Sequence, residues 1–152
     1  MSTIAAPLLL SLLLPAEGKP APKGPLDKAA LKELKALEGD WVVQRIEAEG
    51  KKHSPEDGET MKFTIKGTKW AFPASGEQGE VVALGTSSNP KLIDLSSTRR
   101  GRGAIVREGI YKLDGDTLTF ALYQGKEKKR PTNFDTPTEE GAVVFVLKRA
   151  KR

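Results

Sequence analysis

From Asp40 to the end of the chain, the sequence is a series of short segments typical of β-strands. Met61–Lys66 and Thr117–Leu122 alternate apolar and polar residues, and a period of two places the apolar side chains on one face of an extended strand. Asp114-Gly115 separates two segments and is a strong hairpin signal, because both residues tolerate positive φ. The expected strands are, in chain order, 41–47, 61–66, 70–72, 81–84, 91–95, 105–113, 117–122 and 142–149.

About eight strands with no helix-length segment between them predict an all-β, antiparallel barrel or sandwich. A length of 152 residues fits a single domain. Closure into a barrel would remove the exposed strand edges through which β-proteins aggregate. An eight-stranded barrel is wide enough to be filled by its own side chains or to hold one small ligand, and the pattern leaves both open.

One short helix is expected before the first strand. Asp27 is a good N-cap because its carboxylate can accept hydrogen bonds from the free N–H groups of the first turn. Leu31, Leu34 and Leu37 then recur at a spacing of three and predict an apolar stripe. Gly39 is expected to end the helix.

The first residues differ from the rest of the chain. Ile4–Leu14 is an apolar run whose length fits the hydrophobic region of a signal peptide and is too short to cross a bilayer. We therefore expect residues 1–16 to be a cleaved export signal and 17–25, rich in proline and glycine, to be a linker. Residues 26–152 would form the domain of an exported protein, either periplasmic or secreted.

The segment Leu37-Glu38-Gly39-Asp40-Trp41 resembles the L-E-G-x-W opening of a family of uncharacterised, exported planctomycete proteins. Further matches follow in the same order: Pro90-Lys91, Ile93-Asp94-Leu95, Gly109-Ile110-Tyr111, Leu113 to Leu118, Arg130-Pro131-Thr132 with Phe134, and Val146 to Arg149. The resemblance covers roughly the last three quarters of the chain. It implies export and a lipocalin-like barrel, and it supplies no activity.

Gly39-x-Trp41 is also similar, more remotely, to the start of lipocalins. In that fold such a Trp closes the base of the barrel under a basic residue of the last strand. The resemblance implies the same structural role for Trp41 here, with Arg149 or Lys148 as its partner.

The sequence predicts no catalytic residue, no metal site and no cofactor. The chain has no cysteine, which excludes thiolate nucleophiles and Cys-ligated zinc. Its one histidine, His53, could form a triad with Ser54 and Asp57, but neighbours in one loop rarely converge with an oxyanion hole in place. Asp114 and Asp116 flank a hairpin glycine, and turn chemistry already explains them.

Aromatic residues are the candidates for lining a ligand cavity. We expect Trp70, Tyr111 and Tyr123 to take this part if the barrel is hollow, although aromatics in a small barrel more often fill its core. An apolar ligand would then bind in the barrel interior.

Basic residues gather in two segments that could form an anion-binding rim. The net charge is +5. The candidates are Arg99, Arg100, Arg102, Lys128, Lys129 and Arg130. Two solvated loops are the simpler explanation of such charge. No stacking aromatics accompany these residues, which argues against sequence-specific nucleic-acid recognition.

These features favour a non-enzymatic exported barrel that binds a small apolar or anionic ligand or a partner in the cell envelope. We do not expect it to be an integral membrane protein after processing. The alternative is a hydrolase-type enzyme that uses dispersed carboxylates or the single histidine. An open pocket with two inward carboxylates would favour that alternative.

Overall fold

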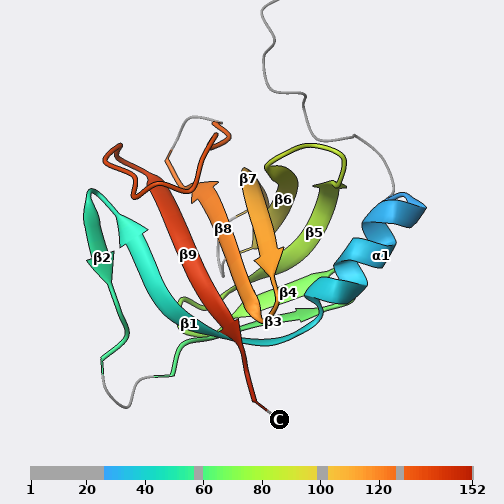
Figure 1. Cartoon of the computed structure of the whole chain (residues 1–152), viewed down its shortest axis with the longest axis horizontal. Helices are drawn as coiled ribbons and strands as arrows, with labels where there is room; N and C mark the ends of the chain where they lie inside the picture. The colour runs from blue at the N-terminus through green and yellow to red at the C-terminus, as the bar shows by residue number, and fades with distance from the viewer. Residues whose placement is uncertain (1–25, 57–59, 99–102, 126–128, 152) are drawn as a thin grey trace, which may run out of the picture.

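The computed structural model describes residues 26–56, 60–98, 103–125 and 129–151. It confirms the expected lipocalin-like, antiparallel barrel of eight strands preceded by one short helix (Figure 1). The expected signal and linker, residues 1–25, lie outside the described part. The elements are α1 (Lys28–Leu37), β1 (Gly39–Ala48), β2 (Lys51–His53), β3 (Lys62–Lys66), β4 (Lys69–Phe72), β5 (Glu77–Gly85), β6 (Lys91–Thr98), β7 (Ile105–Asp114), β8 (Thr117–Tyr123) and β9 (Ala142–Arg149).

Strand β1 closes the barrel. Its first residues pair with β3, and most of its length pairs with β9, so the sheet that runs from β3 to β9 returns to its start. A β-bulge between Val43 and Arg45 bends β1 along the β9 contact. The short β2 pairs only with the far end of β1 and forms a ninth strand outside the closed ring (Figure 1).

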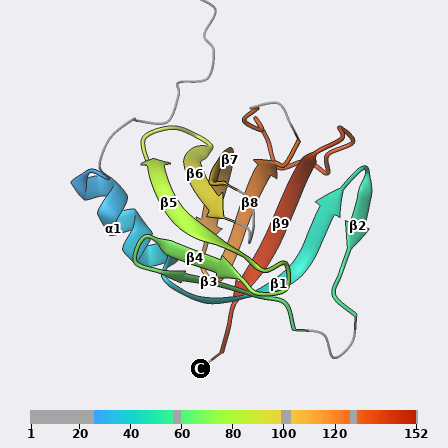
Figure 2. The ribbon, with the colours of Figure 1, turned by 180° about the vertical axis from the view of Figure 1, so that it is seen from behind.

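Helix α1 covers one end of the barrel and lies beside β5 (Figure 2). Asp27 caps it as expected, because its Oδ1 accepts a 2.7 Å hydrogen bond from the backbone N–H of Ala30. The buried stripe is formed by Ala30, Leu34 and Leu37. Leu31, expected in this stripe, is 52% exposed, because it lies about 100° around the helix from Ala30.

The end of the barrel beneath α1 is closed by Trp41. This residue is fully buried, and its Nε1 donates a hydrogen bond to the carbonyl oxygen of Leu37. Arg149, at the end of β9, places its guanidinium over the indole ring. The two residues expected at the base of the barrel thus lie in contact.

Alternation along the strands sorts the side chains into two cores. In β8, Phe120 and Leu122 point inward and belong to the main core. Ala121 points outward and forms a second buried cluster with Ile110 and Val144 on the outer wall. A barrel wall is usually solvated, so something must cover this cluster.

The cover is the segment 129–139, which we call the strap. Arg130 Nη1 lies 2.8 Å from Asp94 Oδ1 and donates a 2.7 Å hydrogen bond to the carbonyl oxygen of Gly109. Further along, Thr136 Oγ1 donates a 3.0 Å hydrogen bond to Glu47 Oε1. The strap is therefore anchored at two places on the outer wall, and the barrel mouth is left uncovered by these contacts.

Candidate ligand cavity

A cavity of about 290 Å³ lies inside the barrel, at the end opposite Trp41. Its mouth is lined by half-buried residues that include Ile46, Ala48 and Val143, so the cavity opens to solvent. Ligand pockets in proteins usually measure roughly 300–1,000 Å³, are mostly apolar and carry a few polar groups. The cavity thus suits a molecule smaller than a typical drug.

Five aromatic rings form the apolar wall of the cavity. Phe63 stacks on Trp70 with 5.5 Å between ring centroids and contacts Phe120 at 5.3 Å. Phe120 in turn stacks on Phe145 at 5.0 Å, and Phe72 lies against Phe145 edge-on at 6.3 Å. Such contacts fix the rings against one another. The wall is consequently a rigid apolar surface supplied by β3, β4, β8 and β9.

One ion pair interrupts this apolar lining. Arg107 on β7 and Glu77 on β5 reach across β6, and Arg107 Nη1 donates a 2.8 Å hydrogen bond to Glu77 Oε2. The two side chains are only 17% and 19% exposed. They are the charged side chains that line the cavity within the described residues.

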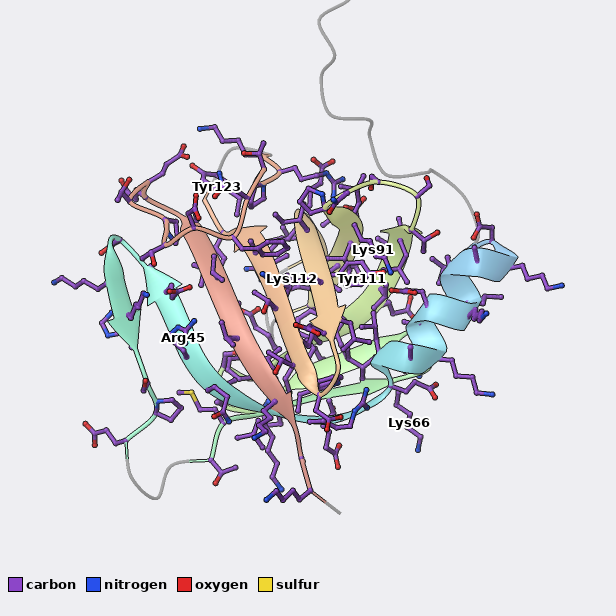
Figure 3. All side chains as sticks on the ribbon, in the orientation of Figure 1. Arg45, Lys66, Lys91, Tyr111, Lys112 and Tyr123 are labelled. Atoms are coloured by element: carbon purple, nitrogen blue, oxygen red, sulfur yellow. The ribbon has the colours of Figure 1, made fainter. Side chains whose placement is uncertain are left out.

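Of the three aromatic residues expected to line the interior, only Trp70 does so. Its Nε1 donates a 3.0 Å hydrogen bond to the backbone oxygen of Ser96, so its polar edge is already satisfied. Tyr111 is fully buried in the core toward the closed end, where burial and then the Glu33 carboxylate raise its pKa. Tyr123 lies two residues after the outward Ala121 on β8, and residues two apart on a strand face the same side. Tyr123 therefore lies on the outer wall (Figure 3).

Sequence reasoning missed both charged residues of the cavity. Arg107 lies four residues before the inward Tyr111 on β7, so the alternation of side chains along the strand could have predicted that Arg107 points inward. Glu77 precedes the expected strand at 81–84, since β5 begins four residues earlier than predicted. The pairing of the two also depends on the register of β6, which the sequence does not reveal.

The predicted basic rim is only partly visible. Four of its members, Arg99, Arg100, Arg102 and Lys128, lie outside the described residues. Lys129 forms an ion pair with Glu139 and lies over the ring of Tyr123. Arg130 lies on the outer wall, where its 13% exposed side chain is held at Asp94 and anchors the strap.

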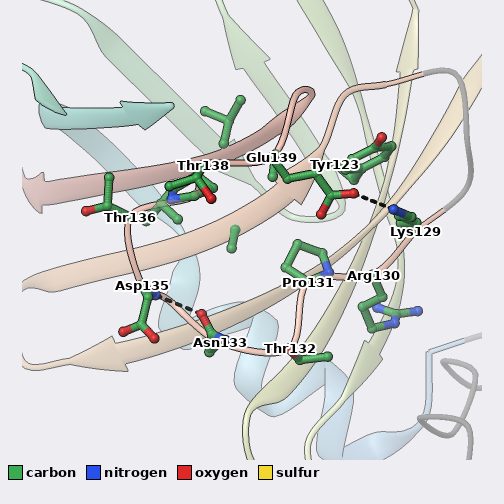
Figure 4. Close-up of a pocket in the computed structure, with 15 residues that line it drawn as sticks. Tyr123, Lys129, Arg130, Pro131, Thr132, Asn133, Asp135, Thr136, Thr138 and Glu139 are labelled. Atoms are coloured by element: carbon green, nitrogen blue, oxygen red, sulfur yellow. Dashed lines mark hydrogen bonds and ion pairs between the residues drawn. The ribbon is translucent and has the colours of Figure 1, made fainter. Parts of the chain in front are cut away.

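A second pocket, of about 400 Å³, lies between the strap and the outer wall (Figure 4). About half of its lining is polar, and several of these polar groups bind one another. Lys129 pairs with Glu139, and Asn133 Oδ1 accepts a hydrogen bond from the backbone N–H of Asp135. Since ligand sites are mostly apolar with few polar groups, we take the interior cavity as the candidate site.

The residues considered for catalysis do not line the cavity. His53 and Ser54 are exposed at the end of β2, and Asp57 lies outside the described residues. Asp116 lies in the β7–β8 turn, with its Oδ1 3.5 Å from Arg149 Nε. In the described ranges, no three His, Cys, Asp or Glu side chains gather where they could hold a metal ion.

Within the same ranges, no helix is long and apolar enough to cross a membrane. Comparisons of the chain with protein-family models, with curated proteins and with solved structures find no match. Membership of the planctomycete family stays a prediction from the motifs.

Proposed function

We propose that this protein is a non-enzymatic binding protein that holds one small, mostly apolar molecule in the barrel interior. The observation that supports this role is the open cavity of about 290 Å³ with five aromatic rings in its wall. Burial of apolar surface contributes about 25 cal/mol per Å², so such a wall favours an apolar guest over water.

The lining of the cavity favours binding over hydrolysis. A hydrolase that uses paired carboxylates needs a general acid and a general base within hydrogen-bond reach of the substrate. Among the described residues Glu77 is the one carboxylate in the lining, and Arg107 already pairs with it. His53 lies on β2, outside the closed ring. The hydrolase alternative therefore has no pair of inward carboxylates to support it in the described part.

We further propose that the protein acts outside the cytoplasm, as a periplasmic or secreted protein. The apolar run of residues 4–14 followed by the linker supports this, as does the resemblance to exported planctomycete proteins. N-terminal sequencing of the protein from its native host tests it. A mature chain that starts near Glu17 is expected, and soluble cytoplasmic protein that keeps Met1 or Ser2 would contradict the proposal.

A neutral apolar dye, N-phenylnaphthylamine, tests the binding site directly. Its fluorescence rises in an apolar environment, so titration of the folded protein should give a saturable increase with one site per chain. Ala48→Phe places a ring in the mouth and should weaken dye binding about tenfold, equivalent to about 1.4 kcal/mol. Ala71→Phe is the matched control, because Ala71 lies between the inward Trp70 and Phe72 and faces outward.

Two results would argue against this function. One is the absence of saturable dye binding by the unsubstituted protein. The other is an equal loss of binding in Ala48→Phe and Ala71→Phe, which would place the dye elsewhere. Thermal unfolding of both variants should show that the barrel stays folded at the temperature of the titration.

A further inference from the structure

The ion pair in the cavity leaves hydrogen-bonding groups available to a guest. Arg107 has five N–H donors, and its one hydrogen-bond partner among the described residues is Glu77 Oε2. In the described part of the chain, Glu77 Oε1 accepts no hydrogen bond from any side chain. The pair thus presents both donors and an acceptor beside the apolar wall.

The same pair carries no net charge. A carboxylate that approached Arg107 would also lie close to Glu77, and an ammonium that approached Glu77 would lie close to Arg107. In either case the charged group of the ligand would lose its hydration shell without gaining an opposite charge of its own. Burial of a charge without a partner is unfavourable. The repulsion is weakly screened because both side chains are more than four-fifths covered.

We propose that the Arg107–Glu77 pair makes the cavity selective for uncharged ligands that carry one hydrogen-bonding group, such as an alcohol or a primary amide. A hydroxyl can accept a hydrogen bond from a free N–H of Arg107 and donate one to Glu77 Oε1. This inference rests on the proposed binding function and adds the chemical class of the ligand.

The position of the pair also sets the orientation of the ligand. Glu77 begins β5 beside the exposed β4–β5 turn, and Arg107 lies two residues from the exposed start of β7. Both therefore lie toward the mouth, while Phe63 and Trp70 are buried deeper. The polar end of the ligand meets the ion pair near the mouth, and its apolar end contacts the aromatic wall.

Three probes of equal chain length test the charge selectivity: octanol, octanoate and octylamine. Calorimetric titration at pH 7 compares a neutral, an anionic and a cationic head group on one apolar tail. Octanol should bind about tenfold more tightly than either charged probe. Octanoate or octylamine binding as tightly as octanol would overturn the inference and leave the binding function intact. No binding of any of the three would count against the binding function itself.

Substitution of the ion pair should reverse the preference. Glu77→Gln leaves Arg107 without its counter-charge, so octanoate should bind about tenfold more tightly while octanol changes less than about threefold. Arg107→Gln should favour octylamine in the same way. Glu80→Gln is the matched control, since Glu80 is exposed on the same strand and removes the same charge.

The control separates a local effect from general electrostatics. If Glu80→Gln improves octanoate binding as much as Glu77→Gln does, net charge and not the ion pair sets the preference, and the inference fails. If Glu77→Gln unfolds, the comparison of the three probes on the unsubstituted protein still decides it.

Discussion

The guanidinium carbon of Arg149 lies 4.3 Å from the centroid of the Trp41 ring. The same guanidinium donates hydrogen bonds of 2.9 and 2.8 Å to the backbone oxygens of Ala36 and Glu38. These carbonyls lie at the C-terminal end of α1, where backbone oxygens lack partners within the helix. One side chain thus joins the last strand, the first strand and the helix at the closed end of the barrel.

Trp41→Ala should destabilise the protein by about 3–5 kcal/mol, the usual cost of removing a large aromatic side chain from a core. The indole is fully buried, and its loss would leave Arg149 over a void. Urea denaturation followed by circular dichroism measures the change. A loss below about 1 kcal/mol would show that the indole is not part of the core.

Arg149→Met should cost about 1–2 kcal/mol, because it removes the cation–π contact and two hydrogen bonds to helix carbonyls. Lys148→Met is the control: the neighbouring side chain is exposed, faces outward and carries the same charge. Its effect should stay within about 0.5 kcal/mol. Equal effects in the two variants would mean that only the loss of a positive charge matters.

The strands of the barrel could be predicted because the side chains on one face of each strand are buried in the core. In β3 the buried Phe63 and Ile65 alternate with more exposed neighbours, which is the signal that the sequence carries. Strand β2 could not be predicted, since all three of its residues are exposed and only backbone pairing with β1 defines it. Leu31 was misassigned because a spacing of three drifts around the helix by about 60° at each step.

The strap had no comparable signal. Its sequence resembles a polar loop, and the apolar residues it covers, Ile110 and Val144, lie on the outer face of their strands, a face that is usually solvated in a barrel. The candidate site shows the same limit. The alternation of side chains along β7 places Arg107 inside the barrel. Its contact with Glu77 depends on strand order and register, which only the folded chain establishes.

Thr136→Val should destabilise the protein by about 1–2 kcal/mol. It removes the 3.0 Å hydrogen bond to Glu47 Oε1, and this buried carboxylate oxygen would keep only the longer contacts with Arg45 Nε at 3.4 Å and Lys52 Nζ at 3.5 Å. Thr132→Val, an exposed position in the same strap, serves as the control. Chemical denaturation measures both, and hydrogen exchange should show faster opening of the strap in Thr136→Val. Indistinguishable variants would mean that the strap does not depend on this bond.

Asp94 on the outer wall gives the protein a dependence on pH that can be assigned to one group. Burial raises the pKa of this carboxyl above its usual value of 3.8, and the hydrogen bond and positive charge of Arg130 only partly oppose that rise. The negative charge of Glu108 raises the pKa further. The folded protein therefore holds the proton of Asp94 more tightly than the unfolded chain does.

The protonated Asp94 carboxyl therefore contributes to the free energy of unfolding. This contribution is fully present at pH values below the pKa of the unfolded chain, and it is lost as the pH rises through the higher pKa of the folded protein. The free energy of unfolding of the unsubstituted protein, minus that of Asp94→Asn, should accordingly fall as the pH is raised from about 3.8 upward. Denaturation of both proteins at a series of pH values from 3 to 7 measures this difference, with the exposed Asp135→Asn as control. A difference that increases with pH would mean that Arg130 outweighs burial. The ion pair under the strap would then stabilise the ionised carboxylate, and the folded pKa of Asp94 would lie below its usual value.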